Sequence, residues 1–227
     1  MNTIAPLPPP PPVRVRPPEL HNGDHLGASE FWRRYQRLPK VKKAELIQGI
    51  VLMASPTRTD THADPDGFML GLLFTYASAN PGVKSSANGT VKLGPDDIVQ
   101  PDSSLRRLPE AGGRARVDAE GYLVGAPELV VEIAASSVSI DCREKKDSCR
   151  RAGVNEYLVW RTEDNAIDAW MLVEETYEPL LPEPDGTVRS RVFPGLWFDL
   201  PALLAGDAAR ALGTLQNGIH AAQAGRA

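Results

Sequence analysis

The spacing of large apolar side chains predicts two helices in the first third of the chain. The first covers residues 29–38, with Ser29 as its N-cap and Pro39 as its stop. The second covers residues 66–79 and ends at Asn80, where a proline and a glycine follow. Both patterns have the period of about 3.6 residues that turns one face of a helix toward a core. The apolar stripe of the second helix consists of Met69, Leu72, Leu73 and Tyr76.

Shorter apolar runs predict that most of the remaining elements are strands. Residues 45–53 contain two such runs around Gln48-Gly49, a pair that is typical of a two-residue hairpin turn. The run at residues 127–135 is apolar on both faces, which is typical of a central strand. Further strands are predicted within residues 83–105, at residues 156–160 and 167–173, and as a pair that brackets residues 184–186.

A helix over residues 141–152 has the clearest end signals in the chain. Asp141 is its expected N-cap, Glu144 completes a pair similar to a capping box, and Gly153 lies where a C-cap belongs. Residues 202–223 are rich in alanine and leucine and predict a C-terminal helix. Helices at the front, strands in the middle and a helix between long strands indicate an α/β fold, with a central mixed β-sheet flanked by helices.

Composition divides the chain into a tail and one domain. The chain has 227 residues, of which 42% are hydrophobic, so a single domain can bury an ordinary core. Its 21 prolines are more than usual, and eight of them lie in the first 18 residues. Residues 1–27 are therefore predicted to be a disordered proline-rich tail, residues 28–205 the folded domain, and residues 206–227 a C-terminal helix.

The sequence also excludes several classes of protein. No apolar run approaches the roughly 20 residues of a membrane-spanning helix, and no basic segment followed by an apolar one marks a secretory signal. Cys142 and Cys149 lie about 10 Å apart on one predicted helix, too far for a disulfide, so we expect a reduced, cytoplasmic protein. The net charge of -4 argues against a general cationic coat for nucleic acid but allows a local basic patch.

Two carboxylates are the first candidates for chemistry. Glu132 lies within the strand that is apolar on both faces, where a carboxylate is costly unless it is paired or binds a metal. The alternative is a strand end at which Glu132 reaches solvent or an arginine. Asp102 follows Pro101 where another predicted strand ends and opens onto a cleft, and its alternative role is to form a turn. Two carboxylates at neighbouring strand ends can bind a hard divalent cation such as Mg²⁺, as in phosphoryl transfer.

A lysine beside such a carboxylate pair would neutralise the charge that develops on a phosphate. In a Glu-x-Lys arrangement the lysine would stand two residues after Glu132, but Ala134 occupies that position. Lys145 is predicted to replace it, because Lys145 lies on the small-residue face of the helix at 141–152 that suits packing on the sheet. Lys146 is expected to point to solvent.

The order and spacing of these residues resemble a known group of enzymes. Pro101-Asp102, Glu132 within Leu-Val-Val-Glu-Ile, and Asp141-x₃-Lys145 are similar to the motifs of the PD-(D/E)XK nuclease superfamily. A more specific resemblance, to the Uma-type restriction endonucleases of bacteria, covers about residues 29–205. The segments that carry it are Glu45-Leu-Ile-x-Gly, Ala54-Ser-Pro followed by His62, Gly153-Val-Asn-Glu-Tyr-Leu-Val-Trp and Val192-Phe-Pro-Gly-Leu-Trp.

The resemblance implies a restriction-endonuclease-like fold and Mg²⁺-dependent hydrolysis of phosphodiester bonds in DNA, with Mn²⁺ able to substitute. It implies that Asp102 and Glu132 are the metal carboxylates and that Lys145 is the displaced catalytic lysine. Glu45, at the end of the first helical segment, would match the family's leading acid and support the metal or its water. His62 would lie near the same cleft, where the alternative is a purely structural histidine.

Two positions depart from the family's common pattern. Gln48 stands where an acid is common, which is a neutral change within a turn. Cys149 stands where a tyrosine is common, which affects packing more than chemistry.

Nucleic acid, with DNA favoured, and a second copy of the chain are the expected partners. A basic stretch without acids lies between Glu30 and Glu45 and could contact a phosphate backbone, or could simply be solvated. Double-strand cleavage would favour a homodimer, for which the apolar C-terminal helix offers a contact. The basic residues of the stretch are Arg33, Arg34, Arg37, Lys40, Lys42 and Lys43.

Two other functions fit the same sequence. A catalytically inactive nuclease-fold module could bind nucleic acid or a protein partner, although the presence of Asp102, Glu132 and a lysine disfavours it. A structural protein could instead use the proline-rich tail to recruit a partner, with the acidic cluster serving only as a salt-bridge network. Deletion of residues 1–27 would then abolish partner binding, whereas a nuclease would keep its activity.

Overall fold

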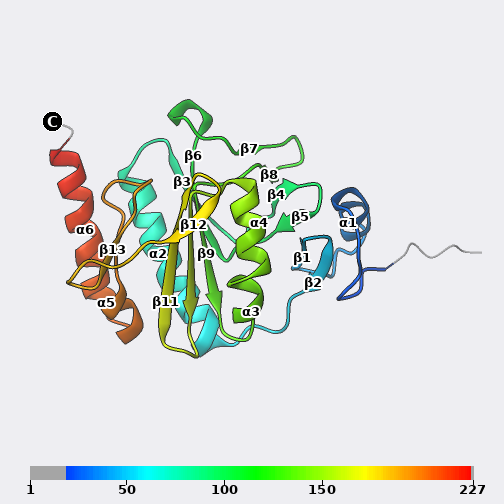
Figure 1. The fold of residues 1–227 in the computed structure, drawn as a ribbon, viewed down its shortest axis with the longest axis horizontal. Helices are drawn as coiled ribbons and strands as arrows, with labels where there is room; N and C mark the ends of the chain where they lie inside the picture. The colour runs from blue at the N-terminus through cyan, green and yellow to red at the C-terminus, as the bar shows by residue number, and fades with distance from the viewer. Residues whose placement is uncertain (1–18, 226–227) are drawn as a thin grey trace, which may run out of the picture.

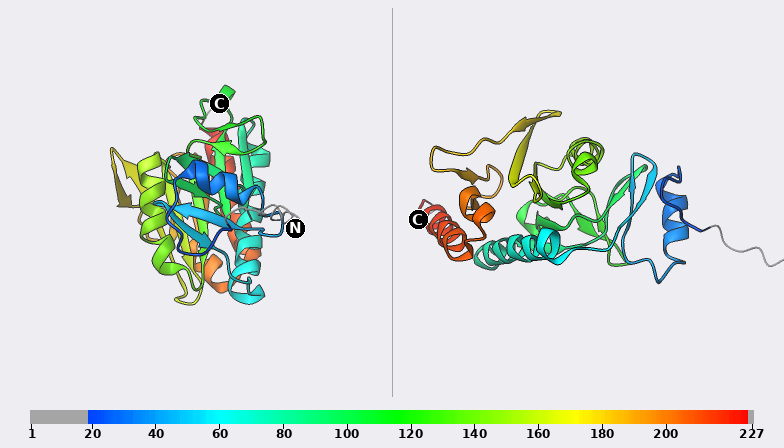
Figure 2. Two further views of the ribbon diagram at one scale, coloured as in Figure 1. Left: turned by 90° about the vertical axis from the view of Figure 1, so that its right-hand side faces the viewer. Right: turned by 90° about the horizontal axis from the view of Figure 1, so that it is seen from below.

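The computed structural model describes residues 19–225, which leaves most of the predicted proline-rich tail outside the described residues. Within this range the chain forms two six-stranded sheets and a two-stranded one. Helices cover both faces of one six-stranded sheet, so the fold is the predicted α/β architecture (Figure 1). Helix α1 (Ala28–Tyr35) and helix α6 (Ala208–Ala224) lie at opposite ends of the long axis (Figures 1 and 2).

The sheet with helices on both faces, here called the central sheet, has the strand order β12-β11-β10-β9-β6-β3. β9 (Leu129–Ala134) and β10 (Glu156–Arg161) run parallel, and the other neighbouring pairs are antiparallel. A parallel pair needs a crossover, which helices α3 (Val138–Asp141) and α4 (Glu144–Ala152) provide. The remaining strands are β3 (Val83–Ala87), β6 (Ser103–Arg107), β11 (Ala166–Val173) and β12 (Thr176–Pro179).

Alternate residues of β9 face two different hydrophobic cores, as the pleat of a strand requires. The odd-numbered residues pack in the main core with helices α2 (Asp64–Ala79), α5 (Leu200–Ala205) and α6. The even-numbered apolar residues pack in a smaller core beneath α4, on the opposite face of the sheet (Figure 2). All six residues of β9 are buried, so Glu132 is enclosed on the α4 side of a central strand.

Helix α2 confirms the predicted apolar stripe, because its four members are its buried residues. The helix begins at Asp64, slightly earlier than expected, and continues from a π-helical turn, η1 (Thr59–Ala63). The η1 turn brings His62 to the base of the helix, close to the start of β6.

The second six-stranded sheet, here called the end sheet, has the order β2-β1-β5-β4-β8-β7 and carries the predicted hairpin. Gln48 and Gly49 have φ of 51° and 76°, the two positive values that a type I′ turn needs. Glu45 therefore lies on β1, and its prediction at the end of a helical segment was wrong. The strands are β1 (Ala44–Ile47), β2 (Ile50–Met53), β4 (Val91–Gly94), β5 (Asp97–Val99), β7 (Arg116–Val117) and β8 (Leu123–Val124).

Two predicted N-caps were wrong. Gly27 caps α1 in place of Ser29, because the N–H of Ala28 already donates to the carbonyl of Pro95 in the end sheet. Asp141 closes the short helix α3, and the backbone of Arg143 (φ -125°, ψ -89°) then separates α3 from α4. Gly153 ends α4 with a φ of 87°, as predicted.

The expected strand pair around residues 184–186 was also wrong. β12 pairs with β11 at the edge of the central sheet, whereas β13 (Thr187–Arg189) pairs with β14 (Trp197–Asp199). Val188 and Phe198, which lie opposite each other in that pair, are both buried in the main core. Burial of these side chains therefore decides the pairing, and the nearby turn signal does not.

The packed chain begins before the predicted boundary at residue 28. Leu20 is buried, the N–H of Leu26 donates to the carbonyl of Gly49, and His25 forms a β-bridge with Ile50. At the other end, Gly206 separates α5 from α6, and the apolar face of α6 is buried in the main core. That face is therefore not free for the expected dimer contact. Within residues 19–225 no helix is both long and apolar enough to cross a membrane, and both cysteines are free.

Candidate active site

The five side chains predicted at the site come from different elements and meet where β5 of the end sheet leads into β6 of the central sheet. Asp102 directly precedes β6, Glu132 lies on β9, and Lys145 lies on α4. Glu45 lies on β1 and His62 on η1. Ion pairs connect these side chains in two groups, one around Lys145 and one around Asp102.

Lys145 is the centre of the first group. Its Nζ lies 2.9 Å from both Glu132 Oε2 and Glu45 Oε1, and 2% of its side chain is exposed. Asp141 Oδ1 is a third carboxylate oxygen, at 3.9 Å. Burial lowers the pKa of the Lys145 ammonium, but the carboxylates, Glu132 first, outweigh this effect and hold the pKa well above its usual value. Lys145 is therefore a fixed positive charge that reaches Glu132 from the helix, with the inward orientation that the sequence predicts.

Asp102 is the centre of the second group. Its Oδ1 accepts a hydrogen bond from Lys43 Nζ at 2.9 Å, and its Oδ2 accepts one from the backbone N–H of Ile133 at 2.9 Å. His62 Nε2 lies 3.5 Å from the same Oδ2. Burial raises the pKa of the Asp102 carboxyl, but the contacts with His62 and Lys43 outweigh it and hold the pKa well below its usual value. Asp102 is therefore a buried, ionised carboxylate that is fixed beside β9.

Glu132 differs from Asp102 because one of its oxygens has no partner. Oε2 faces Lys145, but Oε1 is buried and makes no hydrogen bond within the part of the chain that the structure describes. Burial raises the pKa of the Glu132 carboxyl well above its usual value, against the attraction of Lys145. A buried oxygen without a partner is uncommon in folded proteins and costs stability. Oε1 is thus available to accept a bond from a cation or a proton.

The donor set at the site fits a divalent cation. Mg²⁺ binds through one or two carboxylates and keeps several waters, which matches Asp102 and the unpartnered Oε1 of Glu132. Within the described chain no group of three or more His, Cys, Asp and Glu side chains is arranged to hold a metal, so other oxygens would complete the shell. The site also has more carboxylates than lysines, which favours a bound cation. The carboxylates are those of Glu45, Asp102, Glu132 and Asp141, and the lysines are Lys43 and Lys145.

Comparisons with known proteins give a family and a similar solved structure. Residues 32–202 match the Uma2 family, which is described as "Putative restriction endonuclease". The chain belongs to the Uma2 family. A crystal structure from Anabaena variabilis ATCC 29413, described as "a putative nuclease belonging to DUF820", is similar with a TM-score of 0.58. The two are 17% identical over 76% of this chain and 97% of that chain, so the similarity shows the fold. No curated protein matches the chain.

Two residues of this Uma2 site were not predicted. Lys43 stands two residues before Glu45, and such a pair faces the same side of a strand. Asp141 stands four residues before Lys145, but it was assigned to a cap. Its carboxylate instead accepts a hydrogen bond from Ser137 and faces Lys145, and its carbonyl accepts one from Tyr157. The alternation of a strand could have indicated Lys43, whereas the fold was needed to show that Asp141 faces Lys145.

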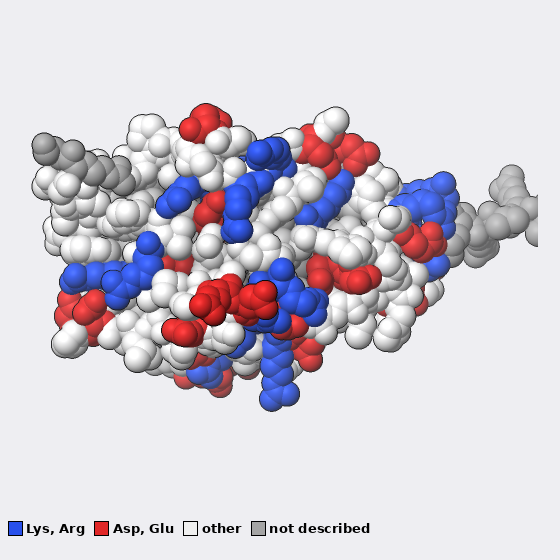
Figure 3. Space-filling model, turned by 45° about the horizontal axis from the view of Figure 1, so that its top comes forward, with Lys and Arg blue, Asp and Glu red and all other residues white. Residues whose placement is uncertain are grey.

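The basic residues that precede Glu45 in the sequence lie in different environments in the structure. Arg33 and Arg34 pair with Glu30 on α1, and Lys43 enters the site. On the face shown in Figure 3, basic and acidic side chains are interspersed. Part of the predicted basic patch is therefore neutralised within the chain. The exposed remainder consists of Arg37, Lys40 and Lys42.

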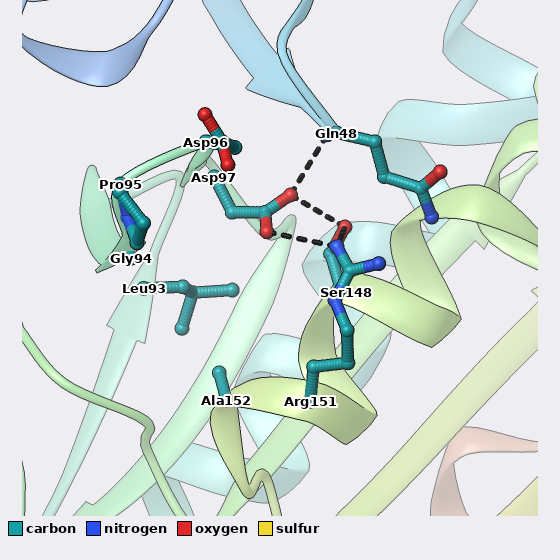
Figure 4. A pocket seen from close by; sticks show the side chains of 9 residues that line it. All are labelled: Gln48, Leu93, Gly94, Pro95, Asp96, Asp97, Ser148, Arg151 and Ala152. Carbon is teal, nitrogen blue, oxygen red and sulfur yellow. Dashed lines mark hydrogen bonds and ion pairs between the residues drawn. The ribbon is translucent and has the colours of Figure 1, made fainter.

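A pocket of about 320 Å³ lies between the tip of the β1–β2 hairpin, the β4–β5 turn and α4 of the Uma2 domain (Figure 4). Asp97 at its wall accepts hydrogen bonds from the backbone N–H of Gln48, from Ser148 Oγ and from Arg151. These bonds join the hairpin that carries Glu45 to the helix that carries Lys145. Gln48 lies in the turn as predicted, and Asp97 holds the hairpin against the helix.

Proposed function

We propose that the protein is an endonuclease that hydrolyses phosphodiester bonds of DNA with Mg²⁺, or with Mn²⁺ in its place. The observation that carries this proposal is the buried Oε1 of Glu132, which has no partner within the described residues. The other carboxylate oxygen of Glu132, Oε2, lies 2.9 Å from Lys145 Nζ, and the ionised Asp102 precedes the neighbouring strand β6. Membership of a nuclease family and the nuclease-like fold support it. Asp102 and Glu132 would hold the cation.

The chain's own residues would divide the reaction between them. A bound divalent cation polarises the phosphate and lowers the pKa of a bound water. Lys145, fixed by Glu132 and Glu45, neutralises negative charge that develops at phosphorus, because its ammonium stays protonated and cannot act as a base. Glu45 also accepts a hydrogen bond from the backbone N–H of Gln100, so it orients Lys145 from a fixed position. Water would attack phosphorus and lose a proton to solvent while the P–O bond to the leaving oxygen breaks. That oxygen would take up a proton from solvent, so the products are a phosphate end and a hydroxyl end.

A homodimer is the assembly we propose for double-strand cleavage, because two copies related by a two-fold axis can each cut one strand. Its contact surface would differ from the apolar face of α6, which is buried in the main core. A sedimentation measurement that shows only monomer at the concentrations used for cleavage would contradict this part of the proposal.

The alternative is a catalytically inactive module that binds nucleic acid or a protein partner. One observation favours it: Asp102 and Glu132 are each already paired with a lysine, and the described chain holds no group of three metal-binding side chains. In that case the site would be a structural salt-bridge network, and the protein would bind DNA without cutting it.

Cleavage of a supercoiled plasmid with Mg²⁺ or Mn²⁺ distinguishes the two functions. The wild type should cleave, and Asp102→Ala, Glu132→Ala and Lys145→Ala should each lower the rate by about 100-fold or more. Lys146→Ala is the matched control, because Lys146 follows Lys145 on α4 but contacts the ring of Trp170 instead of the site.

Full activity in one of the site variants would remove that residue from the proposal. Failure of the wild type on many nucleic acids, together with retained binding, would support the inactive module. Calorimetric titration with Mn²⁺ adds a readout that does not depend on cleavage, since loss of Asp102 or Glu132 should weaken cation binding.

A further inference from the structure

The two lysines of the site differ in burial and in number of partners. Lys145 has 2% of its side chain exposed and lies 2.9 Å from each of two carboxylates. Lys43 has 26% of its side chain exposed, and among residues 19–225 the one carboxylate within 4 Å of its ammonium is Asp102. Lys145 is therefore enclosed, whereas Lys43 reaches the site from its solvent side.

The strand pattern explains why Lys43 enters the site at all. It directly precedes β1, and its carbonyl accepts a hydrogen bond from the N–H of Ala54, so the extended pairing continues through it. Residues 43 and 45 then face the same side, and both side chains meet the site. Lys42 falls on the other side of the alternation and is exposed.

Lys43 occupies an oxygen that a cation at Asp102 would need. Its ammonium lies 2.9 Å from Asp102 Oδ1, while Oδ2 is already engaged by the backbone of Ile133. A divalent cation at Asp102 repels an ammonium at that distance. A lysine on a flexible four-carbon stem can move away, and its solvent-side exposure leaves it space to do so.

We infer that Lys43 is a second cationic residue of the site, which pairs with Asp102 in this structure and moves to a phosphate oxygen of the substrate when a cation binds at Asp102. This inference rests on the proposed nuclease function. It assigns different roles to the two lysines: Lys145 is held in place by carboxylates, and Lys43 is free to follow the anionic substrate. The sequence resemblance gives Lys43 no such role.

The carboxylates around Lys43 favour the charged form of its ammonium. Burial lowers the pKa of that ammonium, but attraction to Asp102, then to Glu45 and Glu132, outweighs burial and the repulsion from Lys145, and the pKa is raised.

Three variants of the full-length protein test the inference. Lys43→Met removes the charge and keeps the stem, Lys43→Arg keeps the charge, and Lys146→Met is the control, because Lys146 lies outside the basic stretch and contacts the ring of Trp170. Within residues 19–225 the Lys146 side chain makes no ion pair. For each protein we would measure Mn²⁺ affinity by calorimetry, binding of a labelled DNA duplex by anisotropy in Ca²⁺, and single-turnover cleavage with Mg²⁺.

Lys43→Met should change two readouts in opposite directions. Mn²⁺ should bind about tenfold more tightly, because a competing positive charge leaves Asp102, while cleavage should slow by about 100-fold and DNA binding should weaken. Lys43→Arg should restore most of the cleavage, and Lys146→Met should match the wild type.

Two results would overturn the inference. Cleavage by Lys43→Met at the wild-type rate would show that Lys43 does not contact the substrate. Parallel loss of Mn²⁺ affinity and cleavage, with a lower unfolding free energy, would show that Lys43 only supports Asp102 structurally. Absence of cleavage in the wild type would count against the proposed function instead, and tighter Mn²⁺ binding by Lys43→Met would still support the placement of Lys43 over Asp102.

Discussion

At the scale of single residues, Lys145 determines how the buried charges of the site are balanced. It is paired with Glu132 and Glu45 and lies within 3.9 Å of Asp141. Removal of one partner from a buried ion pair leaves the other charge uncompensated, which costs more than the loss of an exposed pair. The same lysine therefore has to be treated as a stability residue as well as a candidate for the chemistry.

We predict that Lys145→Met lowers the free energy of unfolding by about 3–5 kcal/mol in the absence of metal. Urea unfolding at neutral pH measures this change. Lys146→Met is the control, because among residues 19–225 the ammonium of Lys146 contacts the Trp170 ring and forms no ion pair. This variant should lose about 1 kcal/mol or less. Equal effects of the two substitutions would mean that the Lys145 network adds nothing to stability.

The residue scale also shows what the sequence could and could not predict. Glu132 was predictable because a charge within an apolar strand violates the pattern around it, and Lys145 because it is the lysine on the packing face of its helix. Asp141 was misassigned, since its local signal fits an N-cap and only the fold brings its carboxylate to Lys145. Lys43 was placed in a surface patch, because composition does not show which of six basic residues points inward.

At the scale of elements, the site depends on a hairpin and a helix that are far apart in the sequence. Asp97 joins them by accepting hydrogen bonds from Gln48 at the hairpin tip and from Ser148 and Arg151 on α4 (Figure 4). Strand and helix periods predicted these elements well. Their partners were harder to predict, because contacts such as β13 with β14 depend on buried side chains distant in the sequence.

Asp97→Ala should loosen this connection. We expect the unfolding free energy to fall by about 1–3 kcal/mol, because a partly buried backbone N–H and a buried hydroxyl lose their acceptor. Cleavage should fall too, although Asp97 is not part of the site. Urea unfolding and a plasmid assay measure the two effects, with Asp96→Ala, the exposed neighbour, as control. An unchanged stability would show that the hairpin is fixed by other contacts.

Helix α1 offers a test in acid. Glu30 is paired with Arg33 and Arg34, which lower the pKa of its carboxyl to about 2. A lowered carboxyl pKa contributes stability above the unfolded value of about 4.3 and loses it as the pH falls toward 2. The midpoint of urea unfolding should therefore fall more steeply between pH 5 and pH 2 in the wild type than in Glu30→Gln. Parallel pH profiles would contradict the pairing in solution.

At the scale of the whole molecule, residues 20–26 already pack on the end sheet, before the predicted domain boundary at residue 28. Leu20 is buried, and residues 23–26 form hydrogen bonds with the β1–β2 hairpin. These residues follow closely after the last prolines of the proline-rich stretch. Composition locates the prolines, but it cannot show that a few apolar residues after them pack on a strand. The overall α/β class was predictable, because the order of helices and strands already excludes the other layer arrangements.

Two truncations test this boundary and the role of the proline-rich residues. A protein that begins at residue 19 should keep the stability and the cleavage rate of the full chain. One that begins at residue 28 should be less stable, because it loses the buried Leu20 and the bridge between His25 and Ile50. Thermal unfolding and plasmid cleavage measure both. If the protein that begins at residue 19 had no activity, the proline-rich residues would have a function that the site does not explain.

The central claim is that Asp102 and Glu132 bind a divalent cation with which the chain cleaves DNA. The most direct measurement is single-turnover cleavage of a labelled duplex across a Mg²⁺ titration, for the wild type and for Glu132→Gln. We predict a saturable dependence on Mg²⁺, no cleavage in EDTA, and a loss of at least about 100-fold in Glu132→Gln. Cleavage that persists in EDTA, or that is equally fast in Glu132→Gln, would contradict the account.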